Sequence, residues 1–281
     1  MTWLSDTQKS YDALAAGYAD ETRDLLDRLP HVRAGVVLFA DLVRAIGGGP
    51  VADVGCGPGH TTALLRELGA DAFGIDLSPA MIEIARREHP GARFEVGSMT
   101  DLDVADGSLA GVIAWWSLIY IPDDAVPGVL GQFHRVLRPD GVLAVGFHVG
   151  SESKLETTGD GDQSIQTYVH HRQPSRVADW IREAGFTVEA QHLLSPDGPK
   201  PGAILFARRP ADPLADRGRT GELQSRAEGL TLSHAMTHLI ETKLATLGGA
   251  ACARRMTRRP RRPRSGWPGT AWPTPSPRHC S

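Results

Sequence analysis

Short apolar runs and helical apolar spacing alternate along the first 209 residues. The short, β-branched runs bounded by turn residues predict strands at 51–54, 72–76, 93–96, 111–114 and 142–147. Apolar positions that recur every three or four residues predict helices at 61–68, 79–88 and 125–137. Such alternation is typical of a mostly parallel sheet that is covered by helices on both faces.

The segments on either side of this core have their own patterns. Residues 5–18 and 22–46 have helical spacing, and Pro30 is expected to kink or divide the second helix because proline removes a backbone donor. A helix at 176–184 precedes two runs, 187–194 and 203–207, which flank a turn rich in proline and glycine. These two runs predict an antiparallel hairpin at the sheet edge. Residues 151–173 are a variable stretch, in which we expect either substrate-binding insertions or a surface loop.

Local signals set the bounds of the helix at 125–137. Asp123 and Asp124 precede it, and aspartate is a good N-cap residue. The run Arg-Pro-Asp-Gly at 138–141 follows it and predicts a turn that leads into the next strand.

The character of the chain changes after about residue 209. Residues 217–247 have apolar positions at helical spacing and could form an amphipathic helix. Residues 251–281 contain eight arginines, no acidic residue and no Leu, Val, Ile, Phe or Tyr, so we expect a disordered tail. A basic clamp for nucleic acid and a shifted reading frame after about 210 are alternative interpretations. The predicted divisions are N-terminal helices at 1–48, a core domain at 49–209, a linker at 210–250 and the tail at 251–281.

Composition narrows the classes of function. The 281 residues carry 30 Lys and Arg against 33 Asp and Glu, and the basic tail leaves the preceding residues acidic, which disfavours a nucleic-acid partner. No apolar run approaches the roughly 20 residues of a membrane span, and residues 1–10 lack the basic and apolar regions of a secretory signal. We therefore expect a cytoplasmic protein. Three cysteines without a Cys-x-x-Cys pair predict neither a disulfide framework nor a metal site.

The densest chemical signal is the run at 51–60, in which glycines alternate at Gly55, Gly57 and Gly59 between a predicted strand and a predicted helix. Glycine tolerates positive φ and lets a ligand approach the backbone where a Cβ would collide, and the helix N-terminus favours an anion. Asp76 ends the next predicted strand and could accept two hydrogen bonds from a ribose diol. Capping of the following helix is the alternative role for Asp76.

The order Asp53-x-Gly55-x-Gly57-x-Gly59 resembles motif I of the class I S-adenosylmethionine-dependent methyltransferases. Later segments up to about residue 209 are similar to the same superfamily, including a group of actinobacterial small-molecule methyltransferases. The resemblance implies an α/β fold with a Rossmann-like doubly wound seven-stranded sheet, an antiparallel C-terminal hairpin and an N-terminal helical lid. It also implies S-adenosylmethionine as cofactor. The residues expected at the cofactor are Tyr11, Tyr18, Asp53, Gly55, Cys56, Gly57, Gly59, Asp76, Leu77, Met81, Ser98, Met99, Ala114 and Trp115.

Two residues are candidates for the side that binds the methyl acceptor. His148 follows the fifth predicted strand, and an imidazole with an ordinary pKa near 6.5 could act as a general base. A hydrogen bond to the loop backbone is the alternative role for His148. Tyr120 could orient the acceptor, or it could pack against the helix at 125–137.

The expected function is methyl transfer from S-adenosylmethionine to an O, N or C nucleophile of a small molecule, by a monomer or homodimer without a metal. Two other classes stay open. A non-catalytic cofactor-binding scaffold of the same fold is motivated by departures from the residues usual in the family, at Ser98, Leu109-Ala110 and Tyr120. A nicotinamide-dependent oxidoreductase rests only on Gly55, Gly57 and Asp76.

Overall fold

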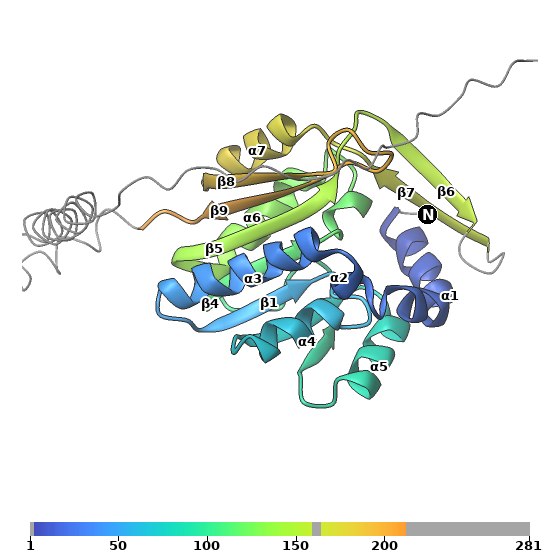
Figure 1. Ribbon diagram of the computed structural model, residues 1–281, viewed down its shortest axis with the longest axis horizontal. Coiled ribbons are helices and arrows are strands. Elements are labelled where there is room, and N and C mark those ends of the chain that lie inside the picture. The colour runs from blue at the N-terminus through green and yellow to red at the C-terminus, as the bar shows by residue number, and fades with distance from the viewer. Residues whose placement is uncertain (1–2, 159–163, 212–281) are drawn as a thin grey trace, which may run out of the picture. The chain divides into compact units, whose positions relative to one another are not determined.

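The structure is a computed structural model that describes residues 3–158 and 164–211 (Figure 1). Its strands are β1 (Pro50–Val54), β2 (Asp71–Asp76), β3 (Phe94–Val96), β4 (Leu109–Trp115), β5 (Leu137–His148), β6 (Ser153–Thr158), β7 (Ser164–His170), β8 (Thr187–Leu194) and β9 (Gly202–Arg208). Its helices are α1 (Trp3–Thr22), α2 (Leu25–Arg28), α3 (Pro30–Ala45), α4 (His60–Glu67), α5 (Pro79–Glu88), the 3-10 turn η1 (Leu118–Tyr120), α6 (Val126–Val136) and α7 (Pro174–Glu183). The helix predicted at 217–247 and the tail predicted at 251–281 lie outside the described residues.

Seven strands of the described chain form one sheet in the order β3-β2-β1-β4-β5-β9-β8. The pairs among β1 to β5 are parallel, whereas β9 runs antiparallel to both β5 and β8. The order reverses between β1 and β4, and ligands of open α/β sheets bind beyond the carboxyl ends of the strands at such a point. The predicted doubly wound sheet with an antiparallel hairpin is confirmed.

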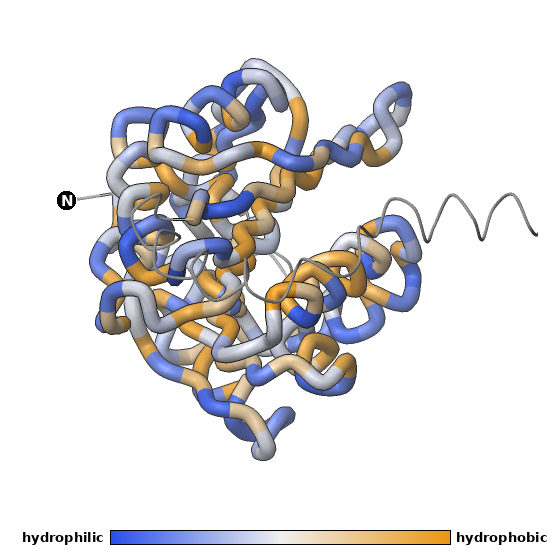
Figure 2. Tube along the Cα trace, turned by 90° about the vertical axis from the view of Figure 1, so that its left-hand side faces the viewer, coloured by the Kyte–Doolittle hydropathy of each residue, from blue (hydrophilic) through white to orange (hydrophobic). Residues whose placement is uncertain are grey.

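The sheet buries apolar side chains on both faces. One face packs on α6 and α7 through residues such as Leu130, Phe133 and Ile181. The other face packs on α3 and α4 through residues such as Phe39 and Leu65. Figure 2 shows apolar stretches running through the interior of the trace and hydrophilic stretches gathering at its turns. No helix among the described residues combines the length and the apolar character needed to cross a membrane.

Helix α1 lies apart from the sheet and contacts α5 and β7. Its Ala15 and Ala19 pack on Met81 of α5. On the other side the Ser10 hydroxyl accepts a hydrogen bond of 3.1 Å from the backbone N–H of Gln166. Pro30 stands at the first position of α3 and so divides the second predicted helix into α2 and α3.

The region at 151–173 differs from its prediction as a loop, because it contains the antiparallel pair β6 and β7. The hairpin was not predicted because its residues lack the apolar alternation of a half-buried strand. Its strands expose large apolar side chains, Leu155 and Tyr168, to about half of their possible area.

The prediction of a turn at 138–141 is also wrong, since β5 runs through these residues. Asp140 takes a positive φ of 63° and its N–H donates to the carbonyl of Arg209, while the Arg209 N–H donates to Gly141. The last strand therefore pairs with the irregular residues and keeps them in the sheet.

The expected N-cap role of Asp123 or Asp124 is not found, because Ala125 is the cap residue of α6 and no side chain caps it. Asp123 instead pairs with Arg172 at 3.0 Å.

Candidate functional site

The loop between β1 and α4 is built around glycines with left-handed backbone. Gly55, Gly57 and Gly59 have φ values of +76°, +53° and +89°. A Cβ on Gly55 would lie 2.2 Å from Cβ of Ser117, so only glycine fits there. A Cβ on Gly57 would meet only the Tyr18 ring, at 3.8 Å. Gly55 therefore allows close packing of the loop, whereas Gly57 leaves the backbone open to a ligand.

Asp76 ties this loop to the end of β2. Its carboxylate accepts hydrogen bonds from the N–H of Gly57 at 2.7 Å and from the N–H of Ser78 at 2.8 Å. The N-cap of α5 is Ser78, whose hydroxyl accepts from the N–H of Met81. Burial raises the pKa of Asp76, and the two backbone donors oppose that shift. Asp76 is thus a brace between loop and helix whose oxygens keep unused acceptor positions.

Asp53 lies beneath the loop and is completely buried. One carboxyl oxygen accepts a hydrogen bond of 2.7 Å from the Thr62 hydroxyl. The other oxygen has no hydrogen-bond partner within the described chain. Burial raises the pKa of Asp53 to about 7. A buried acceptor without a partner is costly, so this oxygen marks a place where a donor or cation from a ligand would be favoured.

Three cavities surround the loop and the hairpin, and Tyr120 lines all of them. One of about 680 Å³ borders Asp53, Gly55 and Gly57. One of about 90 Å³ borders Asp76 and the Ser98 region. One of about 670 Å³ lies between His148 and the β6–β7 hairpin.

Tyrosine side chains fill the space beside Asp76. The ring of Tyr11 lies 4.9 Å from the ring of Tyr120 and 5.9 Å from the ring of Tyr18. Burial raises the pKa of all three hydroxyl groups, so they are neutral near pH 7. The remaining 90 Å³ is far below the roughly 300–1,000 Å³ of ligand pockets. A nucleoside would enter here only if α1 moved outward and took Tyr11 and Tyr18 with it.

Most residues expected at the cofactor do meet around these cavities. The small cavity is lined by Tyr11, Tyr18, Gly55, Gly57, Asp76, Leu77, Met81, Ser98, Met99 and Trp115. Asp53 and Cys56 line the larger cavity beside the loop. Ala114 is fully buried in the core, and the Cβ position of Gly59 faces Phe94 and His89. Neither Ala114 nor Gly59 lines any of the three cavities.

His148 lies at the end of β5 and lines both larger cavities. The indole N–H of Trp116 donates to its Nδ1 at 3.3 Å. Burial, followed by the nearby His171 and Lys200, lowers the pKa of His148 to about 4. The ring is therefore neutral near pH 7, and the Trp116 bond places its proton on Nε2. In this tautomer His148 offers a hydrogen-bond donor and no free basic nitrogen.

Two residues that the sequence did not single out hold the site together. Ser117 donates from its hydroxyl to the carbonyl of Val54 at 2.6 Å, which fixes the end of β4 beside the loop. Arg172 is only 4% exposed and donates to the carbonyls of Leu118 and Ile121, on either side of Tyr120. A lone arginine in a polar stretch carries no sequence signal of burial, so only the fold identifies it.

Comparison with known proteins matches residues 51–141 to a family described as a methyltransferase domain. Residues 51–141 are thus similar to a methyltransferase domain. Over 134 residues the chain is 33% identical to the malonyl-[acyl-carrier protein] O-methyltransferase of Pectobacterium atrosepticum. The aligned residues make up 46% of this chain and 52% of that protein. The chain thus spans about half the length of curated relatives of this kind.

Solved structures share the fold of this methyltransferase domain. Magnesium protoporphyrin IX methyltransferase from Synechocystis PCC 6803, with bound S-adenosylmethionine, matches with a TM-score of 0.56 at 17% identity and covers 74% of this chain and 98% of its own. The 1,6-didemethyltoxoflavin-N1-methyltransferase of Burkholderia thailandensis, with bound S-adenosylhomocysteine, has a TM-score of 0.54 at 23% identity and covers 74% and 87%. These similarities establish the architecture.

Proposed function

We propose that this chain transfers the methyl group of S-adenosylmethionine to a small molecule bound between His148 and the β6–β7 hairpin. The observation that carries the proposal is that the cavity along the glycine loop and the cavity at the hairpin share Tyr120 and His148 as lining residues. Methyl transfer is an in-line displacement, which requires a cofactor site and an acceptor site that meet.

The residues around the loop fit the cofactor. Gly57 leaves room for a ligand against the backbone, and Asp76 has acceptor positions left for ribose hydroxyls. The unpartnered oxygen of Asp53 suits the cationic or N–H groups of the methionyl part. Ser98 and Met99 would face the base. When bound, S-adenosylmethionine supplies a methyl group on a positively charged sulfur, which needs no further activation.

The cavity between His148 and the β6–β7 hairpin favours a nucleophile that is already ionised near pH 7. His148 presents a donor from Nε2 and would orient an acceptor oxygen rather than remove its proton. Lys154 and Lys200 also line this cavity, together with Glu152 and Glu156. A carboxylate is the nucleophile that fits best, because it needs no base and can be held by the Nε2–H and an ammonium group.

Tyr120 stands where the two sites meet, and Arg172 positions it. The guanidinium group holds the main chain on both sides of the tyrosine while pairing with Asp123. The position of the Tyr120 hydroxyl is therefore set by a rigid turn rather than by a free loop.

The experiment incubates the full chain with S-adenosylmethionine labelled in its methyl group and with separate pools of carboxylic acids, phenols and amines. We expect label to enter a product from the carboxylic acid pool and Gly57→Ala to reduce transfer when the cofactor is below saturation. Label in another pool would retain methyl transfer and refute the carboxylate. Cofactor binding without transfer to any pool would refute the activity in favour of a non-catalytic scaffold.

A further inference from the structure

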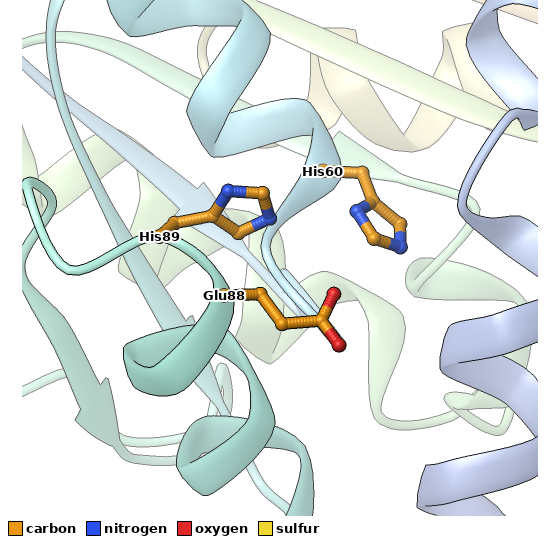
Figure 3. A group of neighbouring side chains, drawn as sticks. All are labelled: His60, Glu88 and His89. Carbon is orange, nitrogen blue, oxygen red and sulfur yellow. The ribbon is translucent and has the colours of Figure 1, made fainter.

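Two histidines and a glutamate meet where α4 begins and α5 ends, and His60 among them also lines the cavity of about 680 Å³ beside the glycine loop. His60 is the first residue of α4, Glu88 is the last residue of α5, and His89 follows it. One ligand atom from each of the three lies within 4.8 Å of the others. Figure 3 shows the side chains converging from these two elements.

The two imidazole rings are only partly exposed. They lie edge to face with ring centres 5.6 Å apart. The Nε2 atom of each ring is buried and makes no hydrogen bond with the described residues. Two buried polar nitrogens without partners are a cost that packing alone does not require.

The residue types of the cluster suit a cation. Glu88 is the acidic member, and its carboxylate is bound by Arg23 at 3.1 and 3.2 Å. Neutral imidazole and carboxylate are the form in which these groups bind metals.

We propose that His60, Glu88 and His89 form a site for a divalent transition-metal ion such as Zn²⁺. Two imidazole nitrogens and one carboxylate oxygen are a ligand set that zinc accepts, with water completing the tetrahedron. Ligands at about 2.1 Å from a tetrahedral zinc lie about 3.4 Å apart, so small side-chain rotations bring the three atoms into range.

A metal bound by His60, Glu88 and His89 would affect the neighbouring glycine loop. His60 directly follows Gly59, and the Cβ position of Gly59 lies 3.0 Å from the His89 ring. A bound ion would join the start of α4 to the end of α5 directly behind the glycine loop. It would therefore stabilise the arrangement on which the loop depends.

Arg23 competes with the metal for Glu88. Its side chain is 50% exposed, so it can leave the carboxylate for solvent when a cation arrives. Removal of Arg23 should then strengthen metal binding, whereas removal of Glu88's charge should weaken it. A histidine pair that serves only for packing would respond to neither change.

The test uses the full chain with His234→Ala and His238→Ala as background, because histidines four residues apart can bind a metal by themselves on a helix. After chelator treatment, Co²⁺ is titrated while visible absorption is recorded, and Zn²⁺ is then added in competition. We expect one Co²⁺ per chain that Zn²⁺ displaces. His60→Ala, His89→Ala and Glu88→Gln should each weaken binding about tenfold or more, and Arg23→Gln should strengthen it several-fold.

His31→Ala is the matched control, since His31 is exposed on α3, and it should leave the titration unchanged. Circular dichroism without metal checks that each variant folds. If a histidine variant fails to fold, the opposite effects expected of Glu88→Gln and Arg23→Gln decide the question. Absence of a saturable Co²⁺ signal in the background chain, or unchanged affinity in the folded ligand variants, overturns the proposal.

Discussion

Replacement of Gly57 by alanine tests whether the loop between β1 and α4 binds a ligand or serves only as a turn. Gly57 has a φ of +53°, and an alanine there costs about 1–2 kcal/mol in the left-handed region. The added methyl meets only the Tyr18 ring at 3.8 Å, so no clash adds to this strain. The melting temperature should fall by about 2–8 °C, at roughly 2–4 °C per kcal/mol for a domain of this size.

The matched control is Gly69→Ala at the end of α4. Gly69 has a φ of +85°, and a Cβ there would have no neighbour within 4 Å. Both variants should therefore lose similar stability in thermal denaturation. Only Gly57→Ala should also weaken the binding of S-adenosylhomocysteine, by about tenfold or more in calorimetry, because the added methyl group occupies space that the ligand needs. Equal affinity of the two variants would refute the assignment of the loop as the cofactor cradle.

Three further substitutions probe the braces of the site. Asp76→Asn should weaken cofactor binding about ten- to hundredfold in calorimetry, since hydrogen bonds to a charged acceptor contribute roughly 1.5–3 kcal/mol; a change under twofold would leave Asp76 with only its structural bonds. Asp53, with a pKa of about 7 when folded against about 3.9 unfolded, binds more protons in the folded state, so its contribution to stability falls as pH rises from about 4 to 7. Urea unfolding at pH 5 and pH 8 should show this decline in the wild type and a smaller one in Asp53→Asn; equal declines would contradict the raised pKa. Arg172→Lys should cost about 2–3 kcal/mol in urea unfolding and lower the rate of methyl transfer, because lysine cannot serve Asp123 and two carbonyls together; wild-type stability would rule out this bracing role.

The strands of the parallel part of the sheet could be predicted because they are short apolar runs separated by helical spacing. The same approach failed at β6 and β7, whose residues have no apolar alternation because the pair forms its own two-stranded sheet. It also failed at Asp140, where the Pro-Asp-Gly signal is typical of a turn but pairing with Arg209 keeps the strand continuous. Sequence signals of this kind report on local structure. The β6–β7 pair and the continuity of β5 at Asp140 depend instead on pairing with residues that are distant in the sequence.

In the candidate site, too, some features follow from sequence spacing and others only from the fold. Gly55, Gly57 and Asp76 lie within about 20 residues of one another, and their spacing indicates a ligand loop before the fold is known. The state of His148 depends on Trp116, 32 residues away, which donates to Nδ1 and removes the basic nitrogen that the sequence alone suggests. The pairing of His60 with His89 likewise results from the approach of the start of α4 to the end of α5 and from no spacing rule.

Calorimetric titration of the full chain with S-adenosylmethionine, S-adenosylhomocysteine and reduced nicotinamide adenine dinucleotide tests the central claim most directly. The account predicts one saturable site for each of the first two ligands and none for the third. It further predicts that binding releases protons near pH 6.5, because a cationic ligand beside Asp53 lowers the raised pKa of that carboxyl. Absence of binding by both sulfur-containing ligands at millimolar concentration, or saturable binding of the nicotinamide alone, would contradict it.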